Sequence, residues 1–176
     1  MKHIGRFSSN FTLLFMFLLS YGNQTSGQKN VNISAGFGLP ELLNIGVRYQ
    51  LEQVQIGLSV GSIPVKKDES IFSVSGDVFY HFGGYSKLST RHPWYGRVGL
   101  DYLKDETETL LDKYLYLNSR IGRDFNISKK IAIEIEAGAF FRLFYNEIRK
   151  NPSNAWEFDF NFPVLPSFGI GLSYCL

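Results

Sequence analysis

The chain contains very little cysteine and no sustained charge of one sign, and each shortage removes a class of function. Cys175 is the single cysteine among 176 residues, so a disulfide scaffold, a zinc finger and a redox CxxC centre are all excluded. Lysine and arginine total 18 against 16 acidic residues, and basic residues occur in runs no longer than two. A nucleic-acid partner is therefore not expected. The sequence also predicts no cofactor and no metal site.

The chain also lacks any run of apolar residues at helical spacing, whereas aromatic residues are plentiful. Phenylalanine, tyrosine and tryptophan make up 16% of the sequence, and charged residues make up only 19%. Disordered chains show the opposite balance, so a folded domain is predicted. From Val31 to Tyr174, apolar and polar residues alternate with a period of two. That period is typical of β-strands, and we expect an all-β protein.

The first 27 residues have the order of a secretory signal peptide. Lys2 and Arg6 precede the apolar stretch 11–19, and small and polar residues follow at 20–27. At 1.5 Å per residue this stretch covers only about half of a ~30 Å hydrocarbon core, so cleavage is favoured over a permanent helical anchor. We expect cleavage after Gly27, which makes residues 28–176 the mature barrel domain with equal numbers of basic and acidic residues.

Eight segments of the mature region have the alternation and the length of membrane-crossing strands. Each is roughly ten residues long, as a tilted strand needs to be to cross a bilayer. An even number of strands places both termini on one side. The simplest closure is an eight-stranded antiparallel up-and-down transmembrane β-barrel with its termini in the periplasm. The segments are 31–38, 43–51, 54–63, 71–82, 94–103, 114–125, 131–143 and 164–174.

One face of every predicted strand is apolar and the other is small or polar. In the segment 54–61, valine, isoleucine and leucine occupy the even positions, and glutamine, glycine and serine occupy the odd ones. Alternation alone fits two architectures: a soluble lipocalin-like barrel with an apolar interior, and a membrane barrel with an apolar exterior. The polar face carries mostly glycine, serine and asparagine rather than lysine, glutamate and threonine. This composition favours the membrane barrel, with a crowded polar lumen.

The charged residues of the polar face are arginines and carboxylates. Arginine is the cation best suited to buried pairing with carboxylates, and the lysines fall mainly in the connections. We therefore predict an ion-pair network in the lumen. If the turn at 126–130 sets the register, facing residues sum to about 254–256, which places Arg120 opposite Glu134 or Glu136. The network residues are Arg48, Asp77, Arg97, Asp101, Arg120, Asp124, Glu134, Glu136 and Arg142.

Aromatic residues on the apolar face gather at the predicted strand ends. Membrane barrels carry an aromatic girdle at each interface, because amphipathic rings sit at the level of the lipid headgroups. A soluble barrel has no reason to sort its aromatic residues into two belts. The predicted girdle contains Tyr49, Tyr80, Phe82, Trp94, Tyr102, Phe125 and Tyr174.

Two stretches resemble a known class of small barrels. They are PWYGRVGLDY at 93–102 and RIGRDFNISKKI at 120–131. Both are similar to small outer-membrane β-barrel proteins of the Bacteroidota and, more distantly, to the eight-stranded OmpX/OmpA-like barrels. The resemblance covers about residues 28–176. It implies a Gram-negative outer-membrane protein at the cell surface, and it includes no catalytic motif.

The sequence favours a protein without catalytic activity. An eight-stranded barrel is just wide enough to hold its own side chains, so a general porin is disfavoured. A lipid-modifying enzyme needs a serine, a histidine and a carboxylate within hydrogen-bond reach. His81 shares a face with Asp77, but four residues along a strand separate them by roughly 13 Å. We expect a structural or surface-interaction protein, with a soluble ligand-binding barrel and a lipid-modifying enzyme as the open alternatives.

The last connection is the best candidate for a binding surface. Residues 144–163 contain Trp156, Phe158 and Phe160, each followed by an acidic or amide residue. Aromatic side chains between polar groups can anchor a protein or a glycan, and the alternative is that they pack over the barrel mouth. We therefore expect a monomeric outer-membrane barrel in contact with lipid, with a protein or glycan partner at its extracellular loops.

Overall fold

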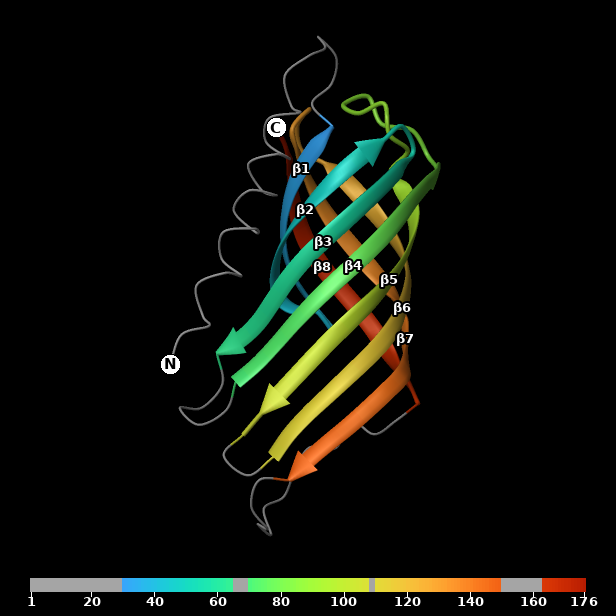
Figure 1. Ribbon diagram of the computed structural model, residues 1–176. Coiled ribbons are helices and arrows are strands. Elements are labelled where there is room, and N and C mark those ends of the chain that lie inside the picture. Colours follow the sequence, from blue (N-terminus) through green and yellow to red (C-terminus); the bar gives the residue numbers. More distant parts are fainter. Residues whose placement is uncertain (1–29, 65–69, 108–109, 150–162) are drawn as a thin grey trace.

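The computed structural model describes residues 30–64, 70–107, 110–149 and 163–176. Its strands form one closed antiparallel sheet in which each strand pairs with its neighbour in sequence and the first pairs with the last (Figure 1). The predicted eight-stranded up-and-down barrel is confirmed. Among the described residues, no helix is long and apolar enough to cross a membrane. The strands are β1 (Val31–Gly38), β2 (Leu42–Leu51), β3 (Val54–Pro64), β4 (Ser70–Gly83), β5 (Trp94–Glu106), β6 (Leu110–Asn126), β7 (Ile131–Arg149) and β8 (Val164–Cys175).

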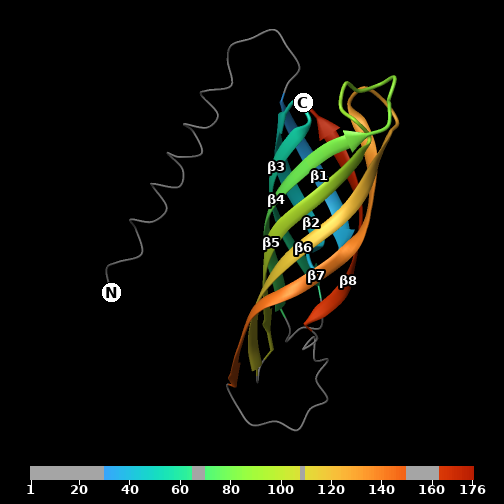
Figure 2. The ribbon, with the colours of Figure 1, turned by 90° about the vertical axis from the view of Figure 1, so that its right-hand side faces the viewer.

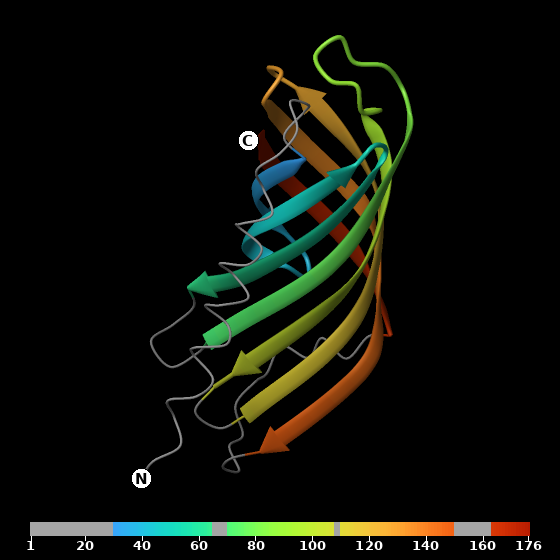
Figure 3. The same cartoon turned by 45° about the horizontal axis from the view of Figure 1, so that its top comes forward.

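The two ends of the barrel differ in shape. One end, here called the terminal end, holds both ends of the described chain and the connections 52–53, 84–93 and 127–130 (Figures 1 and 3). The opposite end, here called the loop end, is uneven because β6 and β7 have 17 and 19 residues whereas β1 and β2 have 8 and 10. The long strands β5, β6 and β7 therefore project beyond the rest, and the β1–β2 turn lies part-way along the barrel (Figure 2).

Three strands are longer at the loop end than the sequence analysis predicts. β5 continues to Glu106, β6 begins at Leu110 rather than at Tyr114, and β7 continues to Arg149 rather than ending at Leu143. The outward positions in these extensions include lysine and asparagine, so the apolar alternation fades although the pairing of β6 with β7 continues. A search for apolar alternation therefore ends these strands too early.

The apolar face of every strand points outward. Leu58 on β3, for example, is 69% exposed. Other outward aliphatic residues, such as Ile135 and Ile170, are at least half exposed. Phe79 and Tyr95 point the opposite way and are buried in the interior together with serine, asparagine, arginine and carboxylate side chains. The question that alternation alone leaves open is settled: the polar face lines the lumen.

The β6–β7 register differs from the predicted one. Arg120 pairs with Gly138, and Glu134 and Glu136 pair with Asp124 and Gly122, so facing residues sum to 258. The reason is the turn, in which the backbone N–H groups of residues 127 and 128 donate to the carbonyl of residue 131. The turn is therefore centred on residue 129, one to two residues later than expected. A bulge between Leu115 and Tyr116 then shifts the register further along β6.

An aromatic cluster fills the lumen toward the loop end. The rings of Tyr114 and Tyr116 stack at 5.6 Å, and Tyr116 meets Phe140 edge to face at 4.9 Å. Leu42 and Leu103 complete this small buried core. Aromatic pairs of this geometry stabilise a fold beyond the area that they bury. Side chains thus close this part of the lumen.

Candidate functional site

Arg97 on β5 is the centre of the charged layer inside the barrel. Its Nε and Nη2 atoms donate to both oxygens of Asp77 on β4, each at 2.8 Å. Nη1 lies 2.7 Å from Glu136 on β7, and Nη2 lies 2.6 Å from Glu41. One guanidinium therefore joins three carboxylates from three parts of the barrel. Such planar, multiply bonded contacts are those for which arginine is suited and lysine is not.

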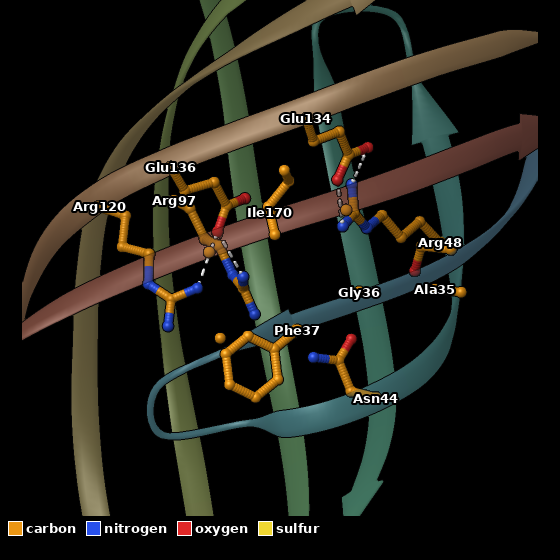
Figure 4. Close-up of a pocket in the computed structure, with 14 residues that line it drawn as sticks. Ala35, Gly36, Phe37, Asn44, Arg48, Arg97, Arg120, Glu134, Glu136 and Ile170 are labelled. Atoms are coloured by element: carbon orange, nitrogen blue, oxygen red, sulfur yellow. Dashed lines mark hydrogen bonds and ion pairs between the residues drawn. The ribbon is translucent and has the colours of Figure 1, made fainter.

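Arg120 on β6 forms the second cationic centre. Its Nη1 donates to Glu136 at 2.8 Å, and its Nη2 contacts Glu41. Asn118 also donates to Glu41, at 3.0 Å, and Tyr95 donates to Glu136 at 2.8 Å. Arg97 and Arg120 thus share two carboxylates, and Figure 4 shows both guanidinium groups turned toward Glu136. The predicted pairing of Arg120 with Glu136 is present, although the two residues are diagonal rather than opposite.

The β1–β2 turn brings Glu41 into the lumen. The carbonyl of Leu39 accepts hydrogen bonds from Arg120 and from the Ser167 hydroxyl, and the Glu41 carbonyl accepts one from Ser73 at 2.7 Å. The turn also presses against Gly61 on β3, where a Cβ atom would lie only 1.9 Å from the Glu41 carbonyl oxygen. Because β1 and β2 are the shortest of the strands that meet here, their turn reaches the centre of the lumen instead of its mouth.

Two further ion pairs lie toward the terminal end. Arg48 on β2 donates to both oxygens of Glu134 at 2.7 and 2.8 Å, as Figure 4 shows. Its guanidinium also covers the ring of Phe79 at 4.3 Å, a favourable cation–π contact. Arg91, from the connection 84–93, pairs with Asp124. These side chains continue the charged layer from the centre of the lumen to the terminal end.

Asp101 and Arg142, two residues of the predicted network, are not members of the ion pairs described above. Asp101 is fully buried beside Glu41 and Asp77, and within the described part of the chain neither of its carboxylate oxygens has a hydrogen-bond partner. Arg142 lies nearer the loop end, where its guanidinium is 5.6 Å from the ring of Tyr145.

Little free space remains within the charged layer. The cavity drawn in Figure 4, next to Arg97 and Arg120, has a volume of about 30 Å³, which is roughly the space of one water molecule. A larger cavity of about 840 Å³ opens at the terminal end, between the strand ends and residues 88–91. The ion pairs separate this vestibule from the loop end.

The two histidines of the described residues, His81 and His92, contact backbone carbonyls and a side-chain amide. Nδ1 of His81 lies 2.8 Å from the carbonyl oxygen of His92, and Nε2 lies 3.4 Å from Oε1 of Gln55. Nδ1 of His92 lies 2.7 Å from the carbonyl oxygen of Gly84. A catalytic triad needs the imidazole between a nucleophile and a carboxylate. Here the partners are backbone carbonyls and an amide, which hold the connection 84–93 against the barrel.

The residues of the predicted aromatic girdle all project from the outer wall. Each is more than a third exposed, and they lie near the strand ends; they are Tyr49, Tyr80, Phe82, Trp94, Tyr102, Phe125 and Tyr174. Arg123, also on the outer wall, contacts two of these rings, at 5.2 Å from Trp94 and 5.0 Å from Phe125. The signal peptide 1–27 and the loop residues Trp156, Phe158 and Phe160 lie outside the described residues.

Sequence reasoning missed two members of the charged layer, Glu41 and Arg91. Both belong to connections, whereas the alternation pattern identifies lumen residues within strands only. Glu41 left a weak signal, since it is the one charged residue between Gly36 and Leu43 in an otherwise apolar or small stretch. Arg91 left none, because nothing in 84–93 indicates that this connection folds back toward Asp124.

Comparison with known proteins identifies structural neighbours only. No family model matches the sequence, and no curated protein matches it significantly. The N-terminal β-barrel domain of OprF from Pseudomonas aeruginosa is similar over 86% of this chain and 100% of that domain, with 15% identity and a TM-score of 0.54. At this identity the similarity shows the fold alone, a closed eight-stranded antiparallel β-barrel.

Two other solved barrels align with the chain at lower scores. Neisserial surface protein A has 9% identity and a TM-score of 0.46, covering 83% of this chain and 94% of that one. CarO from Acinetobacter baumannii has 11% identity and a TM-score of 0.45, covering 88% of this chain and 100% of that one.

Proposed function

We propose that the protein is an integral outer-membrane β-barrel with a filled polar lumen, which serves a structural or surface-interaction role without catalysis. The observation that carries this proposal is the outer wall, where aliphatic side chains form a continuous exposed band between aromatic residues. Water would make such a band unstable, whereas lipid chains match it. The wall thus supplies the lipid contact, and no second subunit is needed to cover it.

The height of the band fits a membrane. On β4, the outward residues run from Phe72 to Phe82. Ten steps at about 3.3 Å, on a strand tilted by about 40°, span roughly 25 Å along the barrel axis, which is the usual height of the apolar band of such barrels. In this orientation the terminal end faces the periplasm and the loop end faces outward. The signal peptide and the origin in Bacteroidota stay predictions.

The lumen supports a role without transport or catalysis. Buried arginines and carboxylates occupy its centre, and the remaining cavity there holds about one water molecule. A general porin needs an open channel, and a lipocalin-like carrier needs an apolar cavity. A lumen filled with charged side chains favours neither function. The environments of His81 and His92 favour structural roles over lipid modification.

The projecting strands favour a surface-interaction role. β5, β6 and β7 project beyond the other strands at the loop end (Figure 2). The outward positions of these extensions include the polar residues Lys104, Lys113 and Asn146. The connection 150–162, with Trp156, Phe158 and Phe160, follows directly after β7 in the sequence. A protein or glycan partner of the extracellular side is the corresponding proposal.

The membrane proposal is tested with two arginine substitutions on the outward face of β3. Leu58→Arg places a charge at mid-band and should cost about 2–4 kcal/mol, whereas Ser62→Arg lies level with Phe72 at the band edge and should cost at most about 1 kcal/mol. The measurement is the fraction of chain that folds into lipid vesicles, read as a heat-dependent gel shift. Equal folding of the two variants would contradict a lipid-facing wall.

A further inference from the structure

We propose that the centre of the lumen binds one calcium ion between Glu41, Asp77 and Asp101. The three carboxylates come from the β1–β2 turn, β4 and β5, and each contributes one oxygen to a group in which all pairs lie within 4.8 Å. Three oxygens that lie no more than 4.8 Å apart have a central point no more than about 2.8 Å from each of them. Calcium–oxygen bonds measure about 2.3–2.6 Å. A small inward shift of the side chains would complete the contacts.

The charges around this point do not balance. Two guanidinium groups, those of Arg97 and Arg120, contact three carboxylates, which belong to Glu41, Asp77 and Glu136. Asp101 is a fourth carboxylate beside them. Arg48, the next cation, is already engaged by both oxygens of Glu134. The cluster therefore carries two excess negative charges, the number that one divalent cation neutralises. Buried carboxylates without compensation are strongly disfavoured.

Two buried polar side chains at this point have no partner among the described residues. Asp101 is 0% exposed, and both of its oxygens are unpaired. Ser75 is 1% exposed, lies directly opposite Asp101 across β4 and β5, and its hydroxyl is also unpaired. Buried polar groups are nearly always satisfied, so the two unpaired oxygens of Asp101, beside Glu41 and Asp77, point to a missing ligand. Ser75 is a neutral oxygen donor, as calcium sites commonly include.

The donor set selects the kind of cation. Carboxylate and hydroxyl oxygens, without sulfur or imidazole, suit hard cations, and calcium accepts the irregular geometry that strands impose better than magnesium does. Oε2 of Glu41 accepts from Arg120, and each oxygen of Asp77 accepts one hydrogen bond from Arg97, so each of these oxygens keeps a second lone pair for the ion. Sequence analysis predicts no metal site because the ligands stand on three separate elements in no recognisable spacing.

The test uses the full mature chain, folded in detergent, stripped with a chelator and titrated with calcium chloride in an isothermal calorimeter. We expect one calcium ion per chain and a rise in the unfolding temperature on calcium addition. Asp101→Asn should weaken calcium binding by at least about tenfold, and Ser75→Ala by a few-fold, because charge count and ligand number set affinity in oxygen sites. The control Asp112→Asn removes a buried carboxylate outside the cluster and should leave binding unchanged.

The gel shift on heating verifies that each variant folds. Absence of stoichiometric calcium binding by the folded wild-type chain would overturn the proposal, and so would equal affinity in Asp101→Asn and wild type. A third overturning result is an Asp101→Asn variant whose unfolding temperature exceeds that of the wild type by the same amount with and without calcium. In that case a proton, which the asparagine mimics, neutralises the cluster instead of a cation.

Discussion

Replacing Arg97 with glutamine tests whether the ion pairs of the lumen hold the barrel together. The Arg97 guanidinium is buried and lies within 2.8 Å of Asp77, Glu136 and Glu41. Its removal leaves Asp77 without its ion-pair partner in a low-dielectric interior, while Arg120 still contacts Glu41 and Glu136. Breaking a buried pair by deleting one partner typically costs about 3–5 kcal/mol. We expect a loss in that range, which is about two to nearly four orders of magnitude in the folding equilibrium.

The assay is urea unfolding of the detergent-folded barrel, followed by tryptophan fluorescence and by the gel shift. With a slope of about 2 kcal/mol per molar urea, the midpoint should fall by about 2 M. The matched control is Arg123→Gln on the outer wall, whose described contacts are with the rings of Trp94 and Phe125; it should cost less than about 1 kcal/mol. Equal losses in the two variants would refute the idea that the central network stabilises the fold.

A second test of that reasoning adds Asp77→Asn to the Arg97→Gln variant, which should recover part of the lost stability because one uncompensated charge disappears. Gly61→Ala should cost about 1–3 kcal/mol through its clash with the Glu41 carbonyl, whereas Gly96→Ala, with nothing within 4 Å, should be nearly neutral in the same urea assay. In planar bilayers the wild-type barrel should show no steady conductance of porin size, and a stable large channel would contradict the filled lumen. Serine at positions 156, 158 and 160 should abolish partner binding in a cell-surface glycan and protein screen without changing the gel shift, and unchanged binding would contradict the proposed loop surface.

The barrel could be predicted from the sequence because its governing pattern is local. Each strand shows the period-two alternation in its own sequence, and the alternation fades only in the extensions of β5, β6 and β7 at the loop end. The composition of the polar face decides between a barrel with an apolar interior and a barrel with an apolar exterior. Glycine, serine and arginine indicated a crowded lumen, and the burial of Arg97 and Arg120 follows from that crowding.

The central site could not be predicted in full because it depends on distances between strands and on a turn. Glu41 reaches Arg97 and Arg120 only because β1 and β2 are short. Rules for which residues pair across two strands do not predict how long each strand is, so they do not place this turn. The register of β6 and β7 depends on how the turn around Lys129 closes, which moved the partner of Arg120 to Gly138. Long side chains compensate for such shifts, so the Arg120–Glu136 contact survives.

The central claim is that the outer wall faces lipid, and the most direct measurement is fractionation of expressing cells followed by gel electrophoresis with and without boiling. We expect a band in the outer-membrane fraction that migrates faster before heating than after, because a closed barrel resists detergent until it is heated. A soluble product that stays folded without lipid or detergent would show that the outer wall does not face lipid.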